Sequence, residues 1–224
     1  MANEVSAVAE EWSSDDSRPT VLGEGYTPAA TRVLGAGIEL FARIGFLATT
    51  VRDLTKLCGI TAPSFYNHFG SKEGLLHDIV EAADAELESR LDAIDVDGLD
   101  PVEALSGLVR TLVIFNLTYP REARIANREW VFLQAEDHTD VLAHRRRVRA
   151  LFERVLDAAP TKRGLLGGDK PSTAAHLETR LLAMSIINMG IDSSDWYRPD
   201  GPLTIEEVAD SYCRLAQRMA GISS

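Results

Sequence analysis

Helical spacing of the apolar residues is the feature that most constrains how this chain folds. From Pro28 to about residue 220, apolar side chains recur three or four positions apart, and no segment alternates apolar and polar residues as a half-buried strand does. The sequence also contains no internal repeat. The pattern therefore predicts an all-α fold of about nine helices.

Residues typical of helix ends divide the chain into segments. In the first third of the chain they predict helices over 28–45, 50–58 and 61–69, and a longer helix from residue 72 onward. Beyond residue 95, prolines and polar residues bound predicted helices over 101–118, 121–136, 139–158, 173–192 and 204–220, with a loop at 161–171. The capping residues of the first part are Thr27, Gly45, Thr50, Gly59, Thr61 and Ser71.

The stretch from Thr49 to Lys72 has the layout of a helix-turn-helix. Two short helices are joined by a tight turn at Gly59, a residue that tolerates the positive φ that such a corner requires. Ile60 is expected to anchor the corner in the core. In this motif the first helix gives support, and the second helix lies in the major groove of DNA.

The second helix of the pair presents short polar groups once its aromatic residues are turned inward. Phe65 and Phe69 lie four positions apart and can face the core together. An asparagine can bond adenine, and small methyl groups can contact thymine. The candidate base-contacting residues are Thr61, Ala62, Ser64, Asn67 and His68. The candidate phosphate-contacting residues are Tyr66, His68 and Lys72, with Thr50 and Arg52 on the supporting helix.

Charge is distributed unevenly along the chain. The net charge is −11, which taken alone argues against nucleic acid. Residues 31–72, however, hold five Lys and Arg and only two acidic residues, which gives this stretch a local charge of +3. Phosphates are attracted to this stretch and repelled by the acidic remainder, which favours one docking orientation on DNA.

Residues 59–76 read GITAPSFYNHFGSKEGLL, in which a Gly, an apolar and a small polar residue precede Tyr-x-His-Phe, Lys-Glu and Leu-Leu. This run resembles the DNA-binding signature of the TetR/AcrR family of bacterial regulators. The resemblance extends from Thr27 to Val80 and departs from the family at Leu54-Thr55, where Ile-Ala is usual. The matching residues are Phe41, Gly45, Phe46, Thr50, Gly59, Ile60, Thr61, Tyr66, His68, Phe69, Lys72, Glu73, Leu75 and Leu76.

The resemblance implies a repressor that reads a palindromic operator as a homodimer joined through its two C-terminal helices. The residues support a dimer independently. Apolar residues of the last helix form a seam with spacings of four, three and four, namely Val208, Tyr212, Leu215 and Met219. The preceding helix is apolar nearly all round from Leu181 to Ile191, so burial is expected on both of its faces. A large monomeric core is the alternative.

Three regions are therefore predicted. Residues 1–26 are acidic and rich in Ser, and we expect them to form a disordered arm with no role in DNA binding. Residues 27–73 are predicted to form the helix-turn-helix DNA-binding domain, and residues 74–224 a helical ligand-binding and dimerisation domain.

The resemblance also implies a small-molecule pocket between the middle helices. Asn188 is polar within an apolar helix, and a buried amide needs a partner, which could be a ligand or another side chain. Residues 195–209 resemble the tail of a family branch that regulates fatty-acid and steroid breakdown in response to acyl-CoA thioesters. The candidate effector-binding residues are Leu112, Phe115, Trp130, Leu133, Met184, Asn188 and Trp196, although any single one of them could instead belong to the core.

A dense basic cluster occupies residues 144–149, with sequence HRRRVR. Arg145 and Arg149 lie one helical turn apart and are candidates to bind the phosphates of a CoA thioester. The alternative, which we favour, is a solvated helix face paired with acidic residues.

Other classes of function find little support in the sequence. The chain has no nucleophile elbow, no phosphate loop and no metal-ligand cluster among its five histidines, so we expect no enzyme, no cofactor and no metal site. Cys58 and Cys213 lack metal-ligand spacing and fit a reduced, cytoplasmic protein. No signal peptide and no membrane-spanning run is present. The alternatives are a regulator of efflux that senses cationic drugs and an adaptor of the same fold that does not bind DNA.

Overall fold

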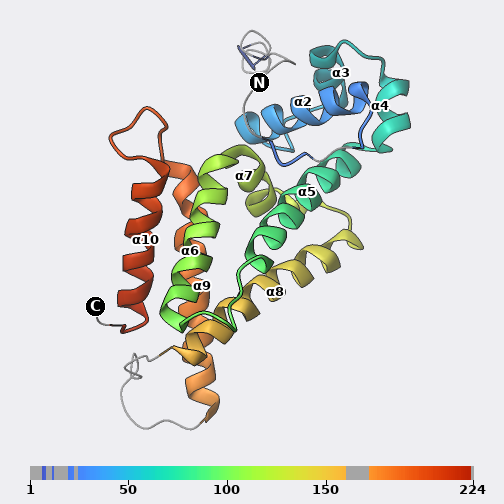
Figure 1. The fold of residues 1–224 in the computed structure, drawn as a ribbon. Coiled ribbons are helices and arrows are strands. Elements are labelled where there is room, and N and C mark those ends of the chain that lie inside the picture. The colour runs from blue at the N-terminus through green and yellow to red at the C-terminus, as the bar shows by residue number, and fades with distance from the viewer. Residues whose placement is uncertain (1–6, 9–11, 13–19, 23–24, 160–171, 223–224) are drawn as a thin grey trace. The chain divides into compact units, whose positions relative to one another are not determined.

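The computed structural model describes residues 7–8, 12, 20–22, 25–159 and 172–222. Its described part between Pro28 and Met219 consists of nine α-helices and one 3-10 helix, and no described residue lies in a strand (Figure 1). The all-α prediction is confirmed. The helices are α2 (Pro28–Ile44), α3 (Val51–Cys58), α4 (Ala62–Phe69), α5 (Lys72–Asp92), α6 (Pro101–Thr118), α7 (Pro120–Arg128), η1 (Trp130–Phe132), α8 (Asp137–Ala158), α9 (Ser172–Trp196) and α10 (Ile205–Met219).

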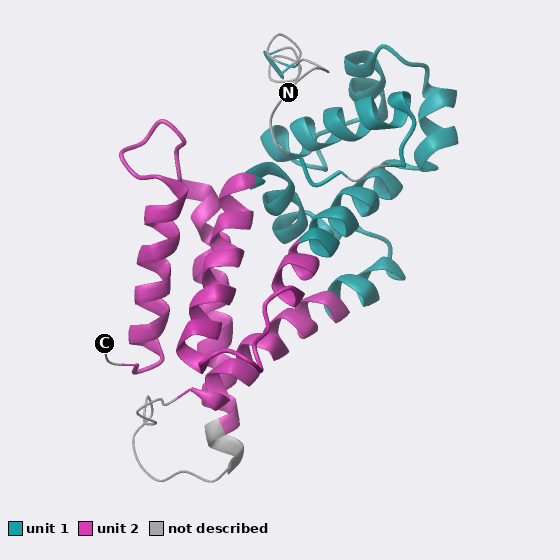
Figure 2. Ribbon diagram, viewed as in Figure 1, with its two compact units in different colours: residues 1–86, 119–142 teal, residues 87–118, 143–224 magenta. Residues whose placement is uncertain are grey.

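The chain divides into two compact units, coloured separately in Figure 2. Unit 1 comprises residues 1–86 and 119–142, and unit 2 comprises residues 87–118 and 143–224. Helices α5 and α8 each contribute residues to both units. The predicted functional boundary between residues 73 and 74 is a different division and stays a prediction. The predicted arm at 1–26 and loop at 161–171 lie mostly outside the described residues.

The helix ends of unit 1 follow the capping residues of the sequence. The Thr27 hydroxyl accepts a hydrogen bond from the Ala30 amide at 3.2 Å, and α2 starts at Pro28. Gly45, with φ of 85°, ends the same helix. At α5 the amide of Gly74 donates to the Ser71 hydroxyl at 2.9 Å. These contacts satisfy backbone groups that a helix end leaves without partners.

Close packing of α2 against α5 depends on a glycine in unit 1. A Cβ atom at Gly37 would lie 2.9 Å from Cδ2 of Leu75 and 3.2 Å from Cδ1 of Ile79. Both of these α5 side chains are fully buried. A larger residue at position 37 would therefore force the two helices apart or displace their side chains.

Helix α2 also packs against α7, through a buried carboxylate. Glu39 is only 5% exposed, and its carboxylate accepts hydrogen bonds from Arg121 at 2.5 Å and from Arg43 at 3.3 Å. A buried charge without such donors would be strongly destabilising. The two arginines therefore allow an acidic residue to lie on the inner face of α2.

The single helix predicted over 121–136 is wrong. Helix α7 ends at Arg128, and a 3-10 turn and an extended Leu133 follow before α8 begins. The break lets the Phe132 ring stack on Phe46, with ring centroids 5.6 Å apart, and lets the Glu129 carboxylate accept from the Phe46 amide at 3.4 Å. These tertiary contacts outweigh the helical periodicity of the segment.

Unit 2 is organised around α6, which packs against both α9 and α10. Helix α10 approaches α6 through a row of buried small side chains, Ala209, Cys213, Ala216 and Ala220. On α9, a Cβ atom at Gly190 would lie 2.7 Å from Cδ2 of Leu112, so the missing side chain permits the close approach. Both cysteines of the chain are free and buried.

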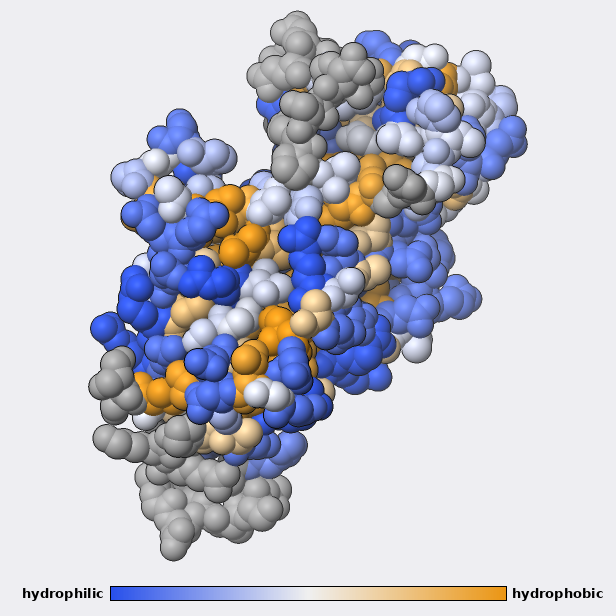
Figure 3. All heavy atoms as spheres, viewed as in Figure 1, coloured by the Kyte–Doolittle hydropathy of each residue, from blue (hydrophilic) through white to orange (hydrophobic). Residues whose placement is uncertain are grey.

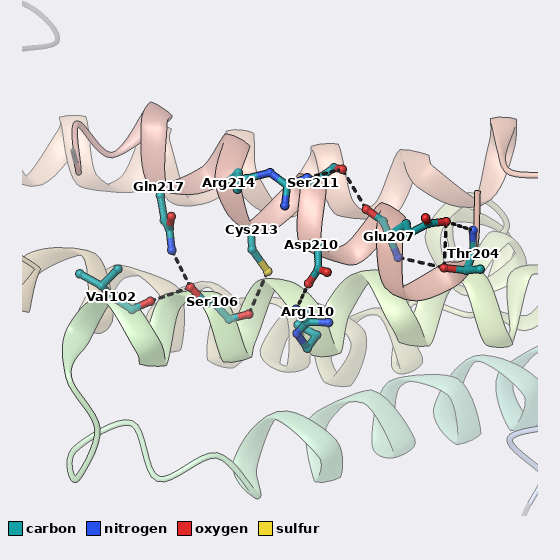
Figure 4. A network of polar contacts seen from close by, with 10 residues as sticks. All are labelled: Val102, Ser106, Arg110, Thr204, Glu207, Asp210, Ser211, Cys213, Arg214 and Gln217. Carbon is teal, nitrogen blue, oxygen red and sulfur yellow. Dashed lines mark hydrogen bonds and ion pairs between the residues drawn. The ribbon is translucent and has the colours of Figure 1, made fainter. Parts of the chain in front are cut away.

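Polar contacts reinforce the packing of α6 on α10 (Figure 4). The Ser106 hydroxyl accepts from the Gln217 amide at 2.9 Å, and the Cys213 thiol donates to the Ser106 carbonyl at 3.3 Å. One turn further along α6, Arg110 forms an ion pair with Asp210. At the start of α10, Thr204 and Glu207 form the predicted reciprocal capping box.

The surface of the described part is mainly hydrophilic on the face shown in Figure 3, where apolar side chains come to the surface in separate small patches. A search of the described residues finds no helix long and apolar enough to cross a membrane.

Candidate nucleic-acid interface and effector residues

The helix-turn-helix of unit 1 consists of α3 and α4, joined at Gly59. The Thr50 hydroxyl accepts from the Asp53 amide at 3.2 Å, and the Asp53 carboxylate accepts from the Thr50 amide at 3.0 Å, which fixes the start of α3. Gly59 ends α3 in the left-handed conformation, with φ of 65° and ψ of 33°. This is the positive φ that the sequence predicts at the corner, and few other residues adopt it without strain.

Helix α4 is oriented by its two phenylalanines. Phe65 is completely buried and Phe69 is 9% exposed, and their rings lie 5.8 Å apart. The opposite face of α4 is left to solvent. The predicted recognition residues lie on that face, where Ser64 is half-buried and the exposed ones are Thr61, Ala62, Tyr66, Asn67 and His68.

Tyr66 combines an exposed position with a fixed ring. The side chain is 50% exposed, and its ring packs edge-on against Phe65 with centroids 5.4 Å apart. The contact with Phe65 fixes one side of the ring, and the rest of the side chain faces solvent. A side chain of this kind can donate a hydrogen bond without losing much conformational freedom.

Thr50 and Arg52 are the predicted phosphate contacts at the supporting helix, and their role stays a prediction. Both residues are exposed at the start of α3. The Thr50 hydroxyl, however, lies 2.5 Å from the Asp53 carboxylate and serves as the helix cap. Arg52 is therefore the stronger phosphate candidate of the two, because its guanidinium carries a full charge.

Lys72, the other predicted phosphate contact, is used within the protein. Its ammonium donates to the carbonyl oxygens of Phe46 at 2.8 Å and Thr49 at 2.7 Å. Burial lowers the pKa of this lysine, and the neighbouring Glu73 opposes that shift. Two of the three N–H donors of Lys72 are therefore engaged, and they join the start of α5 to the turn between α2 and α3. For this reason we do not include Lys72 among the proposed DNA contacts.

The predicted effector residues fall into several groups. Leu112 and Phe115 are buried in α6 of unit 2. Trp130 and Leu133 belong to unit 1, where the Trp130 ring packs edge-on against His138 at 5.3 Å. The two pairs therefore belong to different units.

Met184, Asn188 and Trp196 lie on the exposed face of α9 and not in the core of unit 2. The expectation of a buried amide at Asn188 is wrong. The inner face of α9 instead carries the buried residues Ala183, Ile186 and Gly190. The Trp196 indole donates to the Tyr212 hydroxyl at 3.2 Å, which holds these two aromatic residues together.

The buried amide belongs instead to Asn116 in α6. Asn116 is 1% exposed, and its Nδ2 donates to the Leu112 carbonyl at 2.8 Å. Its Oδ1 is buried and has no hydrogen-bond partner among the described residues. A polar residue inside the apolar run 112–117 was the sequence signal that could have identified it.

The basic cluster at residues 144–149, in the part of α8 that belongs to unit 2, contains residues paired with acidic side chains. Glu88 of α5 accepts from Arg147 Nη2 at 2.7 Å and lies 3.0 Å from Nδ1 of the buried His144. Arg149 forms an ion pair with Glu153 at 3.1 Å. The ion pairs of Arg147 and Arg149 match the solvated-face alternative, and a role of Arg145 and Arg149 in binding CoA phosphates stays a prediction.

Two family models match the chain. Residues 33–79 match a model described as "Bacterial regulatory proteins, tetR family", and residues 98–220 match one described as "Tetracyclin repressor-like, C-terminal domain". The chain belongs to the TetR family. Members of this family are transcriptional regulators and not enzymes, as the sequence predicts.

Relatives along nearly the whole chain are repressors. The HTH-type transcriptional repressor KstR2 of Rhodococcus jostii is 30% identical over 200 residues, covering 85% of this chain and 90% of the relative. The solved structure of the ketosteroid transcriptional regulator KstR2 of Mycobacterium tuberculosis has a TM-score of 0.75 at 24% identity, covering 92% of this chain and 100% of that chain. AibR in complex with isovaleryl coenzyme A and operator DNA has a TM-score of 0.69 at 22% identity, covering 86% and 98%. The two structures share the fold of this chain.

Proposed function

We propose that this TetR-family chain is a repressor that reads its operator through α4. The observation that carries the proposal is the exposed polar face of α4. Phe65 and Phe69 are buried on the opposite face of the helix, and the exposed face includes Asn67. Asparagine bonds adenine through two hydrogen bonds in the major groove. The exposed Tyr66 and Arg52 contact phosphates on either side of the bases.

Dimerisation through α9 and α10 follows from the exposed apolar residues of unit 2. On α9, Leu177, Leu181 and Met184 are 52%, 50% and 41% exposed and follow one another at spacings of four and three. Leu215 on α10 is 43% exposed, whereas Val208 of the predicted seam is buried in the core of unit 2. A stripe of this spacing is suited to packing against the same helix of a second copy.

A twofold dimer accounts for a palindromic operator. Two copies of α4 would then enter successive major grooves about 34 Å apart, so each half-site is read by one protomer. This arrangement makes operator affinity depend on dimerisation, since one protomer alone makes only half of the contacts. The chain would act in the cytoplasm, where the DNA is.

The effector we propose is an acyl-CoA thioester, bound in the helical body and releasing the operator. The buried Oδ1 of Asn116 supports a ligand there, because it lacks a donor among the described residues and an amide N–H of a CoA arm would supply one. AibR, which shares this fold, was solved in complex with isovaleryl coenzyme A and operator DNA, and this supports an acyl-CoA as the ligand class. Leu112 and Phe115 lie close to Asn116 along α6, and we expect them to contact the acyl chain of the thioester.

A mobility-shift assay on the DNA upstream of the chain's own gene tests the proposal. We expect salt-sensitive binding of the wild-type protein, and release by acyl-CoA thioesters but not by free coenzyme A. Tyr66→Ala should abolish the mobility shift while circular dichroism and dimerisation stay unchanged, and Tyr66→Phe should retain part of the shift.

Two other outcomes of the same assay would favour the alternative functions. Release by cationic dyes and never by thioesters would favour a drug sensor. Absence of binding to any duplex after broad operator selection would favour an adaptor.

A further inference from the structure

A cluster of metal-ligating side chains lies on α5 in unit 1, away from the α4 face. Nδ1 of His77 lies 3.6 Å from Oδ1 of Asp78 and 3.9 Å from Oε2 of Glu81. The ligating atoms of the three residues all lie within 4.8 Å of one another. The opposite ring nitrogen, Nε2, lies 3.7 Å from Oδ1 of Asp137 at the start of α8. One imidazole is therefore flanked by three carboxylates.

The two ring nitrogens of His77 face different carboxylates. If Nε2 carries the proton, it faces Asp137 and the ring is oriented by that carboxylate. The lone pair of Nδ1 then faces the oxygens of Asp78 and Glu81, which repel it. Either a proton on Nδ1 or a metal cation between these atoms removes the repulsion. A histidine whose second nitrogen faces a carboxylate is the usual arrangement of a metal-bound imidazole.

The distances suit a small divalent ion. Bonds of roughly 2.0–2.2 Å from Zn²⁺ to nitrogen and oxygen place neighbouring ligand atoms of a tetrahedral site about 3.4 Å apart. The separations of 3.6 Å and 3.9 Å from Nδ1 exceed that value by a few tenths of an ångström, and all three ligand atoms lie within 4.8 Å of one another, so rotations of the side chains would bring them to bonding positions. Glu81 is 71% exposed on its side chain, so an ion and a water ligand can reach the site from solvent.

The surroundings of the imidazole are acidic. The carboxylates of Asp78, Glu81 and Asp137 all lie within 4 Å of a His77 ring nitrogen. A divalent cation at this point of unit 1 would offset part of the negative charge that these groups bring together.

We propose that His77, Asp78 and Glu81 bind a Zn²⁺ ion, with Asp137 orienting the imidazole. The donor set favours zinc-like ions, because imidazole nitrogen selects Zn²⁺ over Mg²⁺ and Ca²⁺. Through Asp137 the ion couples the unit 1 part of α5 to the start of α8, which also belongs to unit 1. The sequence does not reveal the site, because His77, Asp78 and Glu81 read as an ordinary polar helix face and Asp137 is 56 residues from Glu81.

Titration of the full-length, chelator-treated protein with ZnCl₂ in a calorimeter tests the proposal. We expect one Zn²⁺ per chain and a higher melting temperature of the bound protein, with Mg²⁺ producing neither effect. His77→Asn and Glu81→Gln should each weaken Zn²⁺ binding at least about tenfold, and Asp137→Asn should weaken it about 10–100-fold, as loss of an orienting carboxylate does. Co²⁺ should give visible absorption that depends on His77.

His176→Asn serves as the matched control, since His176 is exposed on α9 in the other unit. It should bind Zn²⁺ as the wild type does. Circular dichroism of each variant confirms that it is folded before its affinity is compared. If the wild-type protein binds no Zn²⁺, or if His77→Asn binds it equally well, only a proton occupies the space beside Nδ1 and the proposal is wrong.

Discussion

The ammonium group of Lys72 lies 2.8 Å from the carbonyl oxygen of Phe46 and 4.1 Å above the centroid of the same residue's ring. One side chain thus joins the start of α5 to the turn that follows α2, by a charge-assisted hydrogen bond and a cation–π contact. The arrangement explains why a lysine in the middle of the signature need not reach DNA. Its contribution is to hold the segment that leads into α3.

Lys72→Met should destabilise unit 1. The substitution keeps an apolar stem but leaves the carbonyl oxygens of Phe46 and Thr49 without their donor, which costs about 1–3 kcal/mol. Urea denaturation followed by circular dichroism measures the change. Lys56→Met, at an exposed position of α3, is the matched control and should change stability by less than about 0.5 kcal/mol. Equal stability of the two variants would refute the structural role.

Asn67→Ala and Arg52→Ala should affect DNA binding in different ways. Loss of a base contact at Asn67 should weaken operator binding by about 1–3 kcal/mol and relax the base preference at one position of each half-site. Loss of a phosphate contact at Arg52 should weaken binding to all sequences alike and reduce the salt dependence by about one unit of slope. Binding selections at several salt concentrations distinguish these outcomes. A uniform effect of Asn67→Ala would contradict the proposed orientation of α4.

Leu181→Glu should dissociate the proposed dimer. Leu181 is 50% exposed on α9, so the substitution leaves the core of one protomer intact. A twofold interface contains each residue twice, and two buried carboxylates should raise the dimer dissociation constant at least about 100-fold. Analytical ultracentrifugation measures it. Leu47→Glu, at an exposed position of unit 1, is the control and should leave the dimer unchanged.

Glu88→Gln should lose stability in a pH-dependent manner. The hydrogen bond from Arg147 is the main cause that lowers the pKa of Glu88 from 4.5 to about 2. Because this carboxyl has a lower pKa in the folded state, its stabilisation is complete above about pH 4.5 and is lost as the pH falls toward about 2.

Urea unfolding between pH 7 and pH 3 tests the expectation for Glu88. The wild type should exceed Glu88→Gln by about 1–2 kcal/mol at pH 7, and the difference should shrink steadily below pH 4.5. Glu103→Gln, exposed on α6, is the control and should follow the wild type. A difference that stays constant down to pH 3 would assign the effect to packing instead of charge.

Local patterns in the chain sufficed for the capped ends of α2, α3 and α4 and for the side of α4 that faces solvent. A helical period of 3.6 residues forces Phe65 and Phe69 onto one face, and a glycine corner with flanking threonine caps leaves few alternatives to a helix-turn-helix. These features depend on residues within one or two turns of each other. They could therefore be predicted before any packing was known.

Contacts between distant segments decided the rest. Asn116 and Asn188 both lie in apolar runs, yet Asn116 on α6 is buried, whereas Asn188 on α9 is left exposed by the part of the chain that the structure describes. Lys72 bonds carbonyls 23 and 26 residues earlier, and Asp137 faces His77 across 60 positions. Burial and ion pairing depend on which helices lie opposite one another, and local periodicity carries no information about those neighbours.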